Sequence, residues 1–304
     1  MRIAILGPGG VGGLLAGVLE RAGTQVLVVA RQSTAATIAE RGLRVNSASF
    51  GELTAHPRAV DRLEEPVDAL IVATKASGLK PALERIAVQP KLVLPLLNGL
   101  DHIAILRERF AASAVLAGTI RVEADRPQPG VIVHTSPFLL VQMASADPAA
   151  RAGMQALAQT LCDAGVQVRV LDSEAQVMWS KLVRLNALAC TTSAYDKLLG
   201  EIRSTPQMRA DLYGAIEEAC AVGRAEGADD VDPARAIAEL DAAHATLGSS
   251  MQRDIAAGRT PELDAIPGSV LRAAARHGLR CPTIERLSAT IANRAGISAL
   301  LAPR

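Results

Sequence analysis

Short apolar runs alternate with amphipathic stretches from the beginning of the chain to about Leu171. The most apolar runs are nearly continuous, which is typical of parallel strands that are covered on both faces. These runs are Arg2–Leu6, Gln25–Val29, Asp68–Ala73 and Leu92–Leu97. Helical spacing is found over Gly10–Ala22, Ser77–Ile86 and Asp101–Arg109. Alternation of strand and helix predicts a doubly wound parallel sheet.

The pattern then changes to strands without intervening helices. Strand-like runs cover Val115–Glu123, Val131–Thr135 and Leu139–Met143, with a turn rich in Pro and Gly at Arg126–Gly130. Such a turn between two strand-like runs predicts β-hairpins in this part of the chain.

From about Ser173 onward the strand signals stop and only helical spacing remains. Glycines at plausible helix ends and prolines near helix starts separate the helices. The predicted helices are Glu174–Leu199, Gln207–Glu226, Pro233–Leu240, Ala245–Ala257, Glu262–His277 and Thr283–Ala295. We therefore predict an α/β protein in which a Rossmann-type doubly wound domain, residues 1–171, precedes an all-helical domain, residues 172–304.

Composition excludes several function classes. The 304 residues are 49% hydrophobic with a formal net charge of +1, so the chain lacks the basic surface that binds nucleic acid or an anionic membrane. The charge-free stretch Ile3–Leu19 is interrupted by glycines, and no other apolar run is long enough to span a bilayer. The four cysteines are far apart in sequence, which favours reduced thiols in a cytoplasmic protein.

A glycine motif follows the first predicted strand and opens the first predicted helix. It reads Gly7-x-Gly9-x-x-Gly12, and in this context it indicates dinucleotide binding. Gly7 permits a tight turn, Gly9 leaves room for a pyrophosphate, and Gly12 allows close helix–strand packing. The N–H groups at the helix N-terminus, among them those of Gly10 and Val11, would face the phosphates.

The residue after the second strand selects the dinucleotide. NAD enzymes carry an acidic residue there, about twenty residues after the motif, which binds the ribose 2′-hydroxyl. This chain has Arg31 at that point, and a guanidinium pairs well with a 2′-phosphate. We therefore expect NADP(H).

Several segments together resemble the ketopantoate reductase (2-dehydropantoate 2-reductase) family over nearly the whole chain. Beyond Gly7–Gly12 and Arg31, the resemblance rests on Thr74-Lys75, Leu97-Asn98-Gly99, Met178–Leu182, Ser249-Ser250-Met251 with Asp254, and Glu262-Leu263-Asp264 followed by Gly268. It implies NADPH-dependent reduction of a 2-oxo acid to a 2-hydroxy acid, with 2-dehydropantoate as the first candidate substrate.

The resemblance also assigns roles to residues. Lys181 is implied as the general acid, a role that suits an ammonium because it both stabilises an oxyanion and donates a proton. Glu262 would contact the substrate hydroxyl or keto oxygen, and Ser250 its carboxylate. Asn98 and Lys75 follow strands at the ligand-binding edge of the sheet. Asn98 is a candidate for binding both the substrate and the cofactor, and Lys75 would reach the nicotinamide ribose or the substrate.

Glu262 also has a purely structural interpretation. Thr260-Pro261-Glu262 has the pattern of a helix start, in which the glutamate would interact with the helix dipole.

The chain departs from the family pattern at three positions where ketopantoate reductases typically carry asparagine: Leu185, Ala189 and Leu247. Asn186 does not substitute for the residue at 185, since it lies about 140° round the helix from Lys181. Apolar residues at these positions favour a less polar substrate, so a relative acting on a more apolar 2-oxo acid remains open beside a true 2-dehydropantoate reductase.

Two other classes remain open. A dehydrogenase of the β-hydroxyacid or 6-phosphogluconate type also joins a dinucleotide domain to a helical domain, although Glu262–Asp264 is not its signature. A regulatory protein that binds NADP(H) without turnover is the second. No metal is required where Lys181 supplies the electrophile, and the five histidines form no ligand cluster. Both a homodimer and a monomer are compatible with the Ala- and Leu-rich helices.

Overall fold

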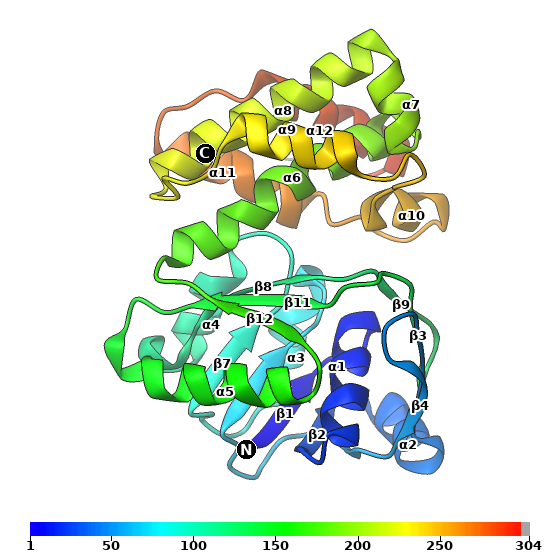
Figure 1. Ribbon diagram of the computed structural model, residues 1–304, viewed down its shortest axis with the longest axis vertical. Coiled ribbons are helices and arrows are strands. Elements are labelled where there is room, and N and C mark those ends of the chain that lie inside the picture. Colours follow the sequence, from blue (N-terminus) through cyan, green and yellow to red (C-terminus); the bar gives the residue numbers. More distant parts are fainter. Residues whose placement is uncertain (299–304) are drawn as a thin grey trace. The chain divides into compact units, whose positions relative to one another are not determined.

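The computed structural model describes residues 1–298 and divides into two compact units (Figure 1). The first unit comprises Met1–Leu97 and His102–Val177, and the second comprises Asn98–Asp101 and the residues from Met178 onward. The sequence prediction placed a single boundary between residues 171 and 172, whereas here four residues in the middle of the first unit belong to the second. Residues 299–304 of the predicted helical domain lie outside the described residues.

The first unit contains a five-stranded parallel sheet in the order β5-β2-β1-β6-β7, the strand order of a Rossmann fold. Its strands are β1 (Arg2–Leu6), β2 (Gln25–Val29), β5 (Arg58–Val60), β6 (Ala69–Val72) and β7 (Leu92–Pro95). The helices of this unit are α1 (Gly10–Arg21), α2 (Gln32–Arg41), α3 (Leu79–Leu83), α4 (His102–Arg109) and α5 (Arg151–Asp163). The predicted α/β fold class is confirmed.

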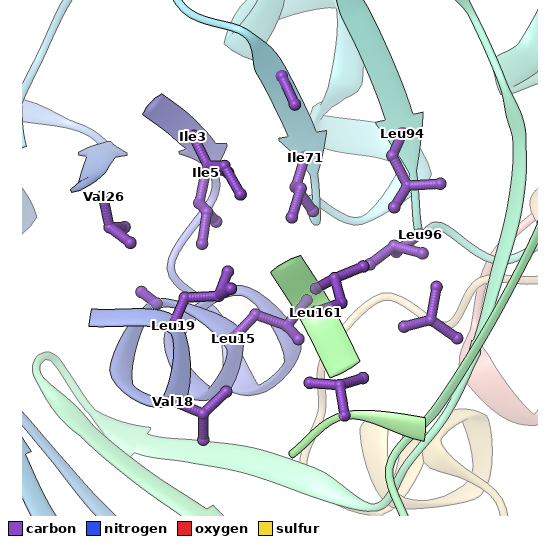
Figure 2. Packing of buried hydrophobic residues seen from close by; sticks show 14 of the residues in the cluster. Ile3, Ile5, Leu15, Val18, Leu19, Val26, Ile71, Leu94, Leu96 and Leu161 are labelled. Atoms are coloured by element: carbon purple, nitrogen blue, oxygen red, sulfur yellow. The ribbon is translucent and has the colours of Figure 1, made fainter. Parts of the chain in front are cut away.

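The two faces of this sheet build two separate hydrophobic clusters. On β1, Ile3 and Ile5 pack with α1 and α5, as Figure 2 shows, whereas Ala4 and Leu6 pack with α3 and α4. Alternate residues of a strand point to opposite faces, so burial on both faces requires the continuous apolar runs seen in the sequence. Each fully buried Ile or Leu contributes about 1.5–3 kcal/mol to folding.

Two smaller sheets complete the first unit, and they correct the predicted hairpins. One has the order β4-β3-β10-β9 and the other β12-β11-β8. Their strands are β3 (Leu43–Ser47), β4 (Gly51–Ala55), β8 (Ala117–Arg121), β9 (Ala124–Gln128), β10 (Val131–His134), β11 (Leu140–Ala144) and β12 (Gln167–Val170). A hairpin is found here, but its turn is shorter than predicted, since Arg126–Gln128 belong to β9, which pairs antiparallel with β10. The strand β8 instead pairs antiparallel with β11 in the other sheet.

The second unit is helical, with α6 (Glu174–Tyr195) continuing into it from the first. The remaining helices are α7 (Leu199–Ser204), α8 (Pro206–Ala225), α9 (Pro233–Ala242), α10 (Ser250–Ala256), α11 (Ser269–Arg276) and α12 (Pro282–Ala295). The prediction ended the first helix at Leu199, but α6 ends earlier because Asp196 has a positive φ of 55°. The Asp196 carboxylate is held there by Arg294 and by Gln252.

Two further helix predictions were wrong in their starting points. The expected helix Ala245–Ala257 begins only at Ser250, because Ser249 provides the N-cap by accepting the N–H of Gln252. The expected helix Glu262–His277 begins with a π-helical turn, η4 (Asp264–Gly268), followed by α11. Glu262 therefore lies just before the helix.

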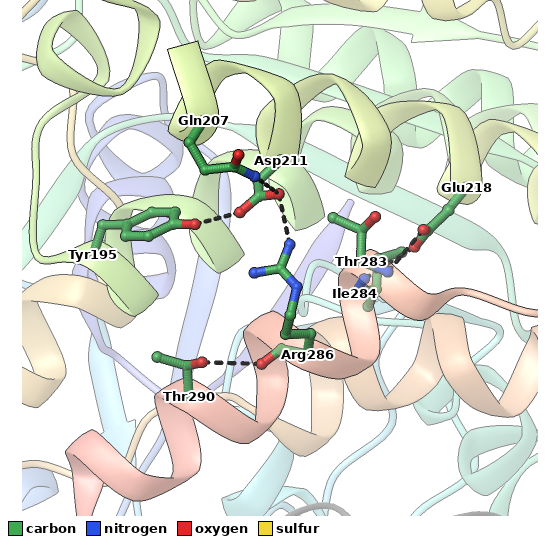
Figure 3. A network of polar contacts seen from close by, with 8 residues as sticks. All are labelled: Tyr195, Gln207, Asp211, Glu218, Thr283, Ile284, Arg286 and Thr290. Carbon is green, nitrogen blue, oxygen red and sulfur yellow. Dashed lines mark hydrogen bonds and ion pairs between the residues drawn. The ribbon is translucent and has the colours of Figure 1, made fainter. Parts of the chain in front are cut away.

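A network of polar side chains joins α6, α8 and α12 (Figure 3). The buried Asp211 accepts hydrogen bonds from the Tyr195 hydroxyl and from Arg286 Nη2, the latter at 2.5 Å. On the same helix, α8, the Glu218 carboxylate accepts the first N–H groups of α12. Because a buried charge is tolerated only when it is paired, this network fixes how the three helices pack together.

The cysteines are all unpaired. Burial raises the pKa of Cys220 to about 11 and that of Cys281 to about 12, and it raises the pKa of Cys190 further. Cys162 is exposed. Three of the four thiols are thus in environments that keep them protonated and unreactive.

Candidate active site

The glycine turn between β1 and α1 has the geometry of a dinucleotide site. Gly7 has φ +93° and donates its N–H to the Val29 carbonyl at 3.0 Å, which brings the turn to the end of β2. A Cβ at Gly12 would lie 2.2 Å from the Gly7 carbonyl oxygen. Only glycine therefore fits at either position.

Gly9 differs from its neighbours because its α-carbon faces open space. A Cβ there would have no atom of the protein within 4 Å, so packing does not explain this glycine. Gly9 is the N-cap of α1 and supplies no side-chain hydrogen bond, and the N–H groups of a first helical turn have no partner within the helix. A pyrophosphate fits this position, because it would take those N–H groups and occupy the space that a side chain would fill.

Gly10 and Val11 owe their identities to packing. A Cβ at Gly10 would lie 2.4 Å from the carbonyl oxygen of Ala124 in β9, and the side chain of Val11 packs against the core. For both residues the backbone N–H is the group that would serve a phosphate.

Three further polar residues follow β2 and β6. Arg31 is exposed just beyond β2, and its side chain makes no hydrogen bond or ion pair within residues 1–298. Lys75 is exposed three residues beyond the end of β6 at Val72. Thr74 was not singled out as a site residue from the sequence, yet its Oγ1 is buried without a partner and its methyl group borders Gly7. A buried hydroxyl without a partner is uncommon, and the signal for it becomes visible only in the structure.

In the helical unit the Asn98 side chain joins two of the predicted catalytic residues. Lys181 Nζ donates a hydrogen bond to Asn98 Oδ1 at 2.8 Å, and Asn98 Nδ2 donates one to Glu262 Oε2 at 2.9 Å. All three side chains are half-buried. Residues from three distant parts of the chain thus form a continuous chain of hydrogen bonds from an ammonium to a carboxylate.

The neighbours of Lys181 on α6 explain its position. Trp179 is 2% exposed and its ring lies against Gly223 of α8, which anchors this turn of the helix. Leu182 is also buried, so the lysine stem leaves the helix between packed residues while its ammonium reaches Asn98. The dipole role that the sequence pattern suggested for Glu262 does not account for its hydrogen bond to Asn98.

Ser250 does not join this chain of hydrogen bonds. It is exposed at the first position of α10, and no hydrogen bond links it to Asn98, Lys181 or Glu262 within residues 1–298. Its role in binding a substrate carboxylate therefore stays a prediction.

The positions that depart from the family pattern contribute apolar surface. Leu185 and Leu247 are half-buried, and Ala189 is fully buried. Asn186 is also fully buried, and it accepts a hydrogen bond from the Cys190 thiol at 3.5 Å. Its side chain thus belongs to the interior of the helical unit.

Models of two protein families match the chain in succession. The model described as ketopantoate reductase PanE/ApbA matches residues 3–144, and that described as its C-terminal domain matches residues 175–295. The 2-dehydropantoate 2-reductase of Mycobacterium tuberculosis is 31% identical to the chain, covering 94% of it and 95% of the relative.

Two solved structures have similar folds. The 2-dehydropantoate 2-reductase of Geobacter metallireducens is 25% identical with a TM-score of 0.88, covering 96% of this chain and 99% of that one. A D-mandelate dehydrogenase, solved with NADH and anilino(oxo)acetate, is 23% identical with a TM-score of 0.89, covering 97% and 99%. At this identity the second likeness speaks for the fold alone.

None of the helices in residues 1–298 is long and apolar enough to cross a membrane. Nor do three or more His, Cys, Asp or Glu side chains come together there in a group that could hold a metal ion.

The contrast between Gly9 and Gly12 gives a direct test of the dinucleotide site. Gly9→Ala should fold normally, since the added methyl group meets no protein atom, but should weaken dinucleotide binding at least about tenfold by obstructing the pyrophosphate. Gly12→Ala should instead destabilise the fold by about 1–3 kcal/mol through overpacking. Thermal unfolding and dinucleotide titration of both variants separate the effects, and wild-type binding by Gly9→Ala would contradict the assignment.

Proposed function

Because this chain belongs to the ketopantoate reductase family, we propose that it reduces a 2-oxo acid to a 2-hydroxy acid with NADPH, with Lys181 as the general acid. The observation that carries this proposal is the chain of hydrogen bonds from Lys181 through Asn98 to Glu262. Family membership and the relatives make the protein an oxidoreductase that uses a nicotinamide cofactor. Family membership also argues against a β-hydroxyacid or 6-phosphogluconate dehydrogenase and against a regulator without turnover.

The dinucleotide would be held in the first unit. The N–H groups at the start of α1 would bind the pyrophosphate beside Gly9, and Arg31 would pair with the 2′-phosphate. The partnerless Thr74 hydroxyl and the Lys75 ammonium would complete the contacts after β6. When bound, the reduced nicotinamide supplies the hydride for the keto carbon.

Lys181 would supply the proton that the reaction needs. As the keto oxygen becomes an alkoxide, the ammonium stabilises the negative charge and transfers a proton to the oxygen, and the neutral amine then regains a proton from solvent. Asn98 Oδ1 holds one N–H of the ammonium and so fixes the direction of the others. Glu262 uses Oε2 for Asn98, which leaves Oε1 to accept the hydroxyl of the substrate or product.

Two substrate classes remain distinct possibilities for this site. 2-Dehydropantoate is the first candidate, because several relatives of this chain are named 2-dehydropantoate 2-reductase. The half-buried or buried apolar residues Leu185, Ala189 and Leu247 favour the second, a 2-oxo acid with a more apolar substituent. The D-mandelate dehydrogenase of similar fold was solved with anilino(oxo)acetate, an oxo acid whose substituent is aromatic.

The four unpaired cysteines support a cytoplasmic location, because a reducing compartment keeps thiols free. A homodimer and a monomer both remain compatible with the sequence.

The substrate can be identified by measuring NADPH oxidation, by absorbance, with each member of a panel of 2-oxo acids. The panel should include 2-dehydropantoate and the 2-oxo counterpart of mandelate. If Leu185, Ala189 and Leu247 line the substrate pocket, Leu185→Asn should raise the ratio of kcat/KM for 2-dehydropantoate to kcat/KM for the apolar acid by about tenfold. The reason is that a buried amide stabilises a bound polar substrate by about 1–3 kcal/mol. An unchanged ratio would show that residue 185 does not contact the substrate. No turnover with any 2-oxo acid would refute the proposed reaction.

The choice of NADPH is tested at Arg31. Arg31→Ala should raise the Kd for NADPH by about 10–100-fold and leave that for NADH unchanged, because the lost charge-assisted hydrogen bonds reach only the 2′-phosphate. Arg41→Ala is a matched control, since Arg41 is also exposed but at the far end of α2. Equal weakening of both dinucleotides in Arg31→Ala would speak against the 2′-phosphate contact.

Removal of the ammonium tests the general acid. Lys181→Ala should lower kcat by about 10²–10⁴ while dinucleotide binding stays nearly unchanged. Lys197→Ala, which removes an exposed lysine that pairs with Glu201, should keep wild-type kcat. A change in Lys181→Ala that is confined to NADPH affinity would contradict the assigned role.

A further inference from the structure

The segment that carries Asn98 is anchored to the helical unit by more than Asn98 itself. Its four residues, Asn98–Asp101, belong to that unit although the residues on both sides belong to the other. Gly99 has φ +87°, and a Cβ there would lie 2.0 Å from the carbonyl oxygen of Ala265 in η4. The backbone beside Asn98 is thus pressed directly against the π-helical turn that follows Glu262.

One guanidinium joins this segment to the segment that carries Glu262. Arg272 Nη2 contacts Asp101 Oδ2 at 2.5 Å, and Arg272 Nη1 contacts Asp264 Oδ1 at 2.7 Å. Nη2 also donates to the Asp264 backbone carbonyl at 2.9 Å. Asp101 is three residues after Asn98, and Asp264 is two residues after Glu262. Arg272 therefore links the segment that carries Asn98 to the segment that carries Glu262.

We propose that Asp101 and Arg272 are positioning residues, whose ion pair holds Asn98 and Glu262 in the register that orients the Lys181 ammonium. This inference rests on the proposed function of those three residues. Within residues 1–298, neither Asp101 nor Arg272 makes a hydrogen bond or an ion pair with Asn98, Lys181 or Glu262, so they act through the backbone of the two segments.

Asn98 and Glu262 need the Asp101–Arg272 ion pair because neither lies in a helix or a strand. Lys181 lies on α6, whose backbone hydrogen bonds fix it, whereas Asn98 lies between β7 and α4 and Glu262 lies in the loop before η4. Residues outside regular elements are positioned only by tertiary contacts. A planar guanidinium with several donors can hold two carboxylates and a carbonyl at once, which a lysine at this position could not reproduce.

The same ion pairs contribute little to folding. The Arg272, Asp101 and Asp264 side chains are 35%, 42% and 79% exposed, and ion pairs at such exposure stabilise proteins only weakly. Their loss should therefore affect turnover more than stability. This separates a positioning role from a structural one.

The test compares Arg272→Gln and Asp101→Asn with a control on the same helix. Both variants should lower kcat about tenfold, because small displacements of catalytic groups are costly, with KM and the Kd for NADPH unchanged. Arg276→Gln is the matched control, since it removes an ion pair with Glu226 one turn further along α11 and should keep wild-type kcat. Thermal unfolding should shift similarly in Arg272→Gln and Arg276→Gln. A purely structural role predicts a loss of stability with kcat unchanged, which would overturn the proposal.

A second measurement decides whether the effect passes through Asn98. In an Asn98→Ala background, adding Arg272→Gln should lower kcat clearly less than in the wild-type background, because one of the two residues that the ion pair positions is already gone. A full additional tenfold loss in that background would overturn the proposal, since Arg272 would then act by another route.

A third measurement does not depend on turnover and so separates this inference from the proposed function. The side-chain amide of Asn98 can be followed by NMR, assigned by its disappearance in Asn98→Ala. Arg272→Gln and Asp101→Asn should shift or broaden its resonances, and Arg276→Gln should leave them in place. If the wild type reduces no 2-oxo acid, the proposed function fails. The NMR result would still decide whether Asp101 and Arg272 position Asn98. Unchanged resonances in Arg272→Gln would show that they do not.

Discussion

An amide placed between an ammonium and a carboxylate is the interaction on which the candidate active site depends. If Lys181 and Glu262 paired directly, the carboxylate would hold the proton that the reaction must release. Asn98 prevents this by accepting from the lysine through one atom and donating to the glutamate through another. An amide is the neutral side chain that offers an acceptor and a donor in fixed geometry. Both charged groups are thus oriented without neutralising each other.

In the first unit, the glycine turn before α1 depends on the absence of side chains. The proposed pyrophosphate site would need backbone N–H groups and space, and the start of α1 offers both where glycines carry no side chain. Each glycine of the turn is nonetheless present for its own reason: Gly7 for its backbone conformation, Gly10 and Gly12 for close packing, and Gly9 for space that no protein atom fills. The rigid double-sided core beneath β1 keeps this turn in place.

Family membership and local chemistry together define what is particular to this chain. The lysine, glutamate and asparagine of the family pattern are present and joined by hydrogen bonds, whereas three further asparagines are replaced by apolar residues. The residues proposed to transfer the proton are therefore present, while three positions proposed to contact the substrate tail are apolar. Such replacements are compatible with the family's fold, because they remove polar groups without displacing Lys181, Asn98 or Glu262.

The sequence by itself determined four of the five strands of the parallel sheet and the glycine turn, and its motifs supplied the candidate catalytic residues. Strands that are buried on both faces require continuous apolar runs. Motif residues keep their order in the sequence even where the loops between them differ in length. The helix Arg151–Asp163 also has a signal in the sequence, since its apolar residues Met154, Leu157, Ala158 and Leu161 follow a helical spacing. The sequence could not reveal which of two hairpin partners β8 would choose, since strand pairing depends on contacts across the fold. Only the tertiary structure showed that α6 ends at a left-handed Asp196, that Glu262 precedes its helix, and that Asn98 bridges Lys181 and Glu262. These features arise from hydrogen bonds between residues far apart in the chain, about which local patterns of hydrophobicity carry no information.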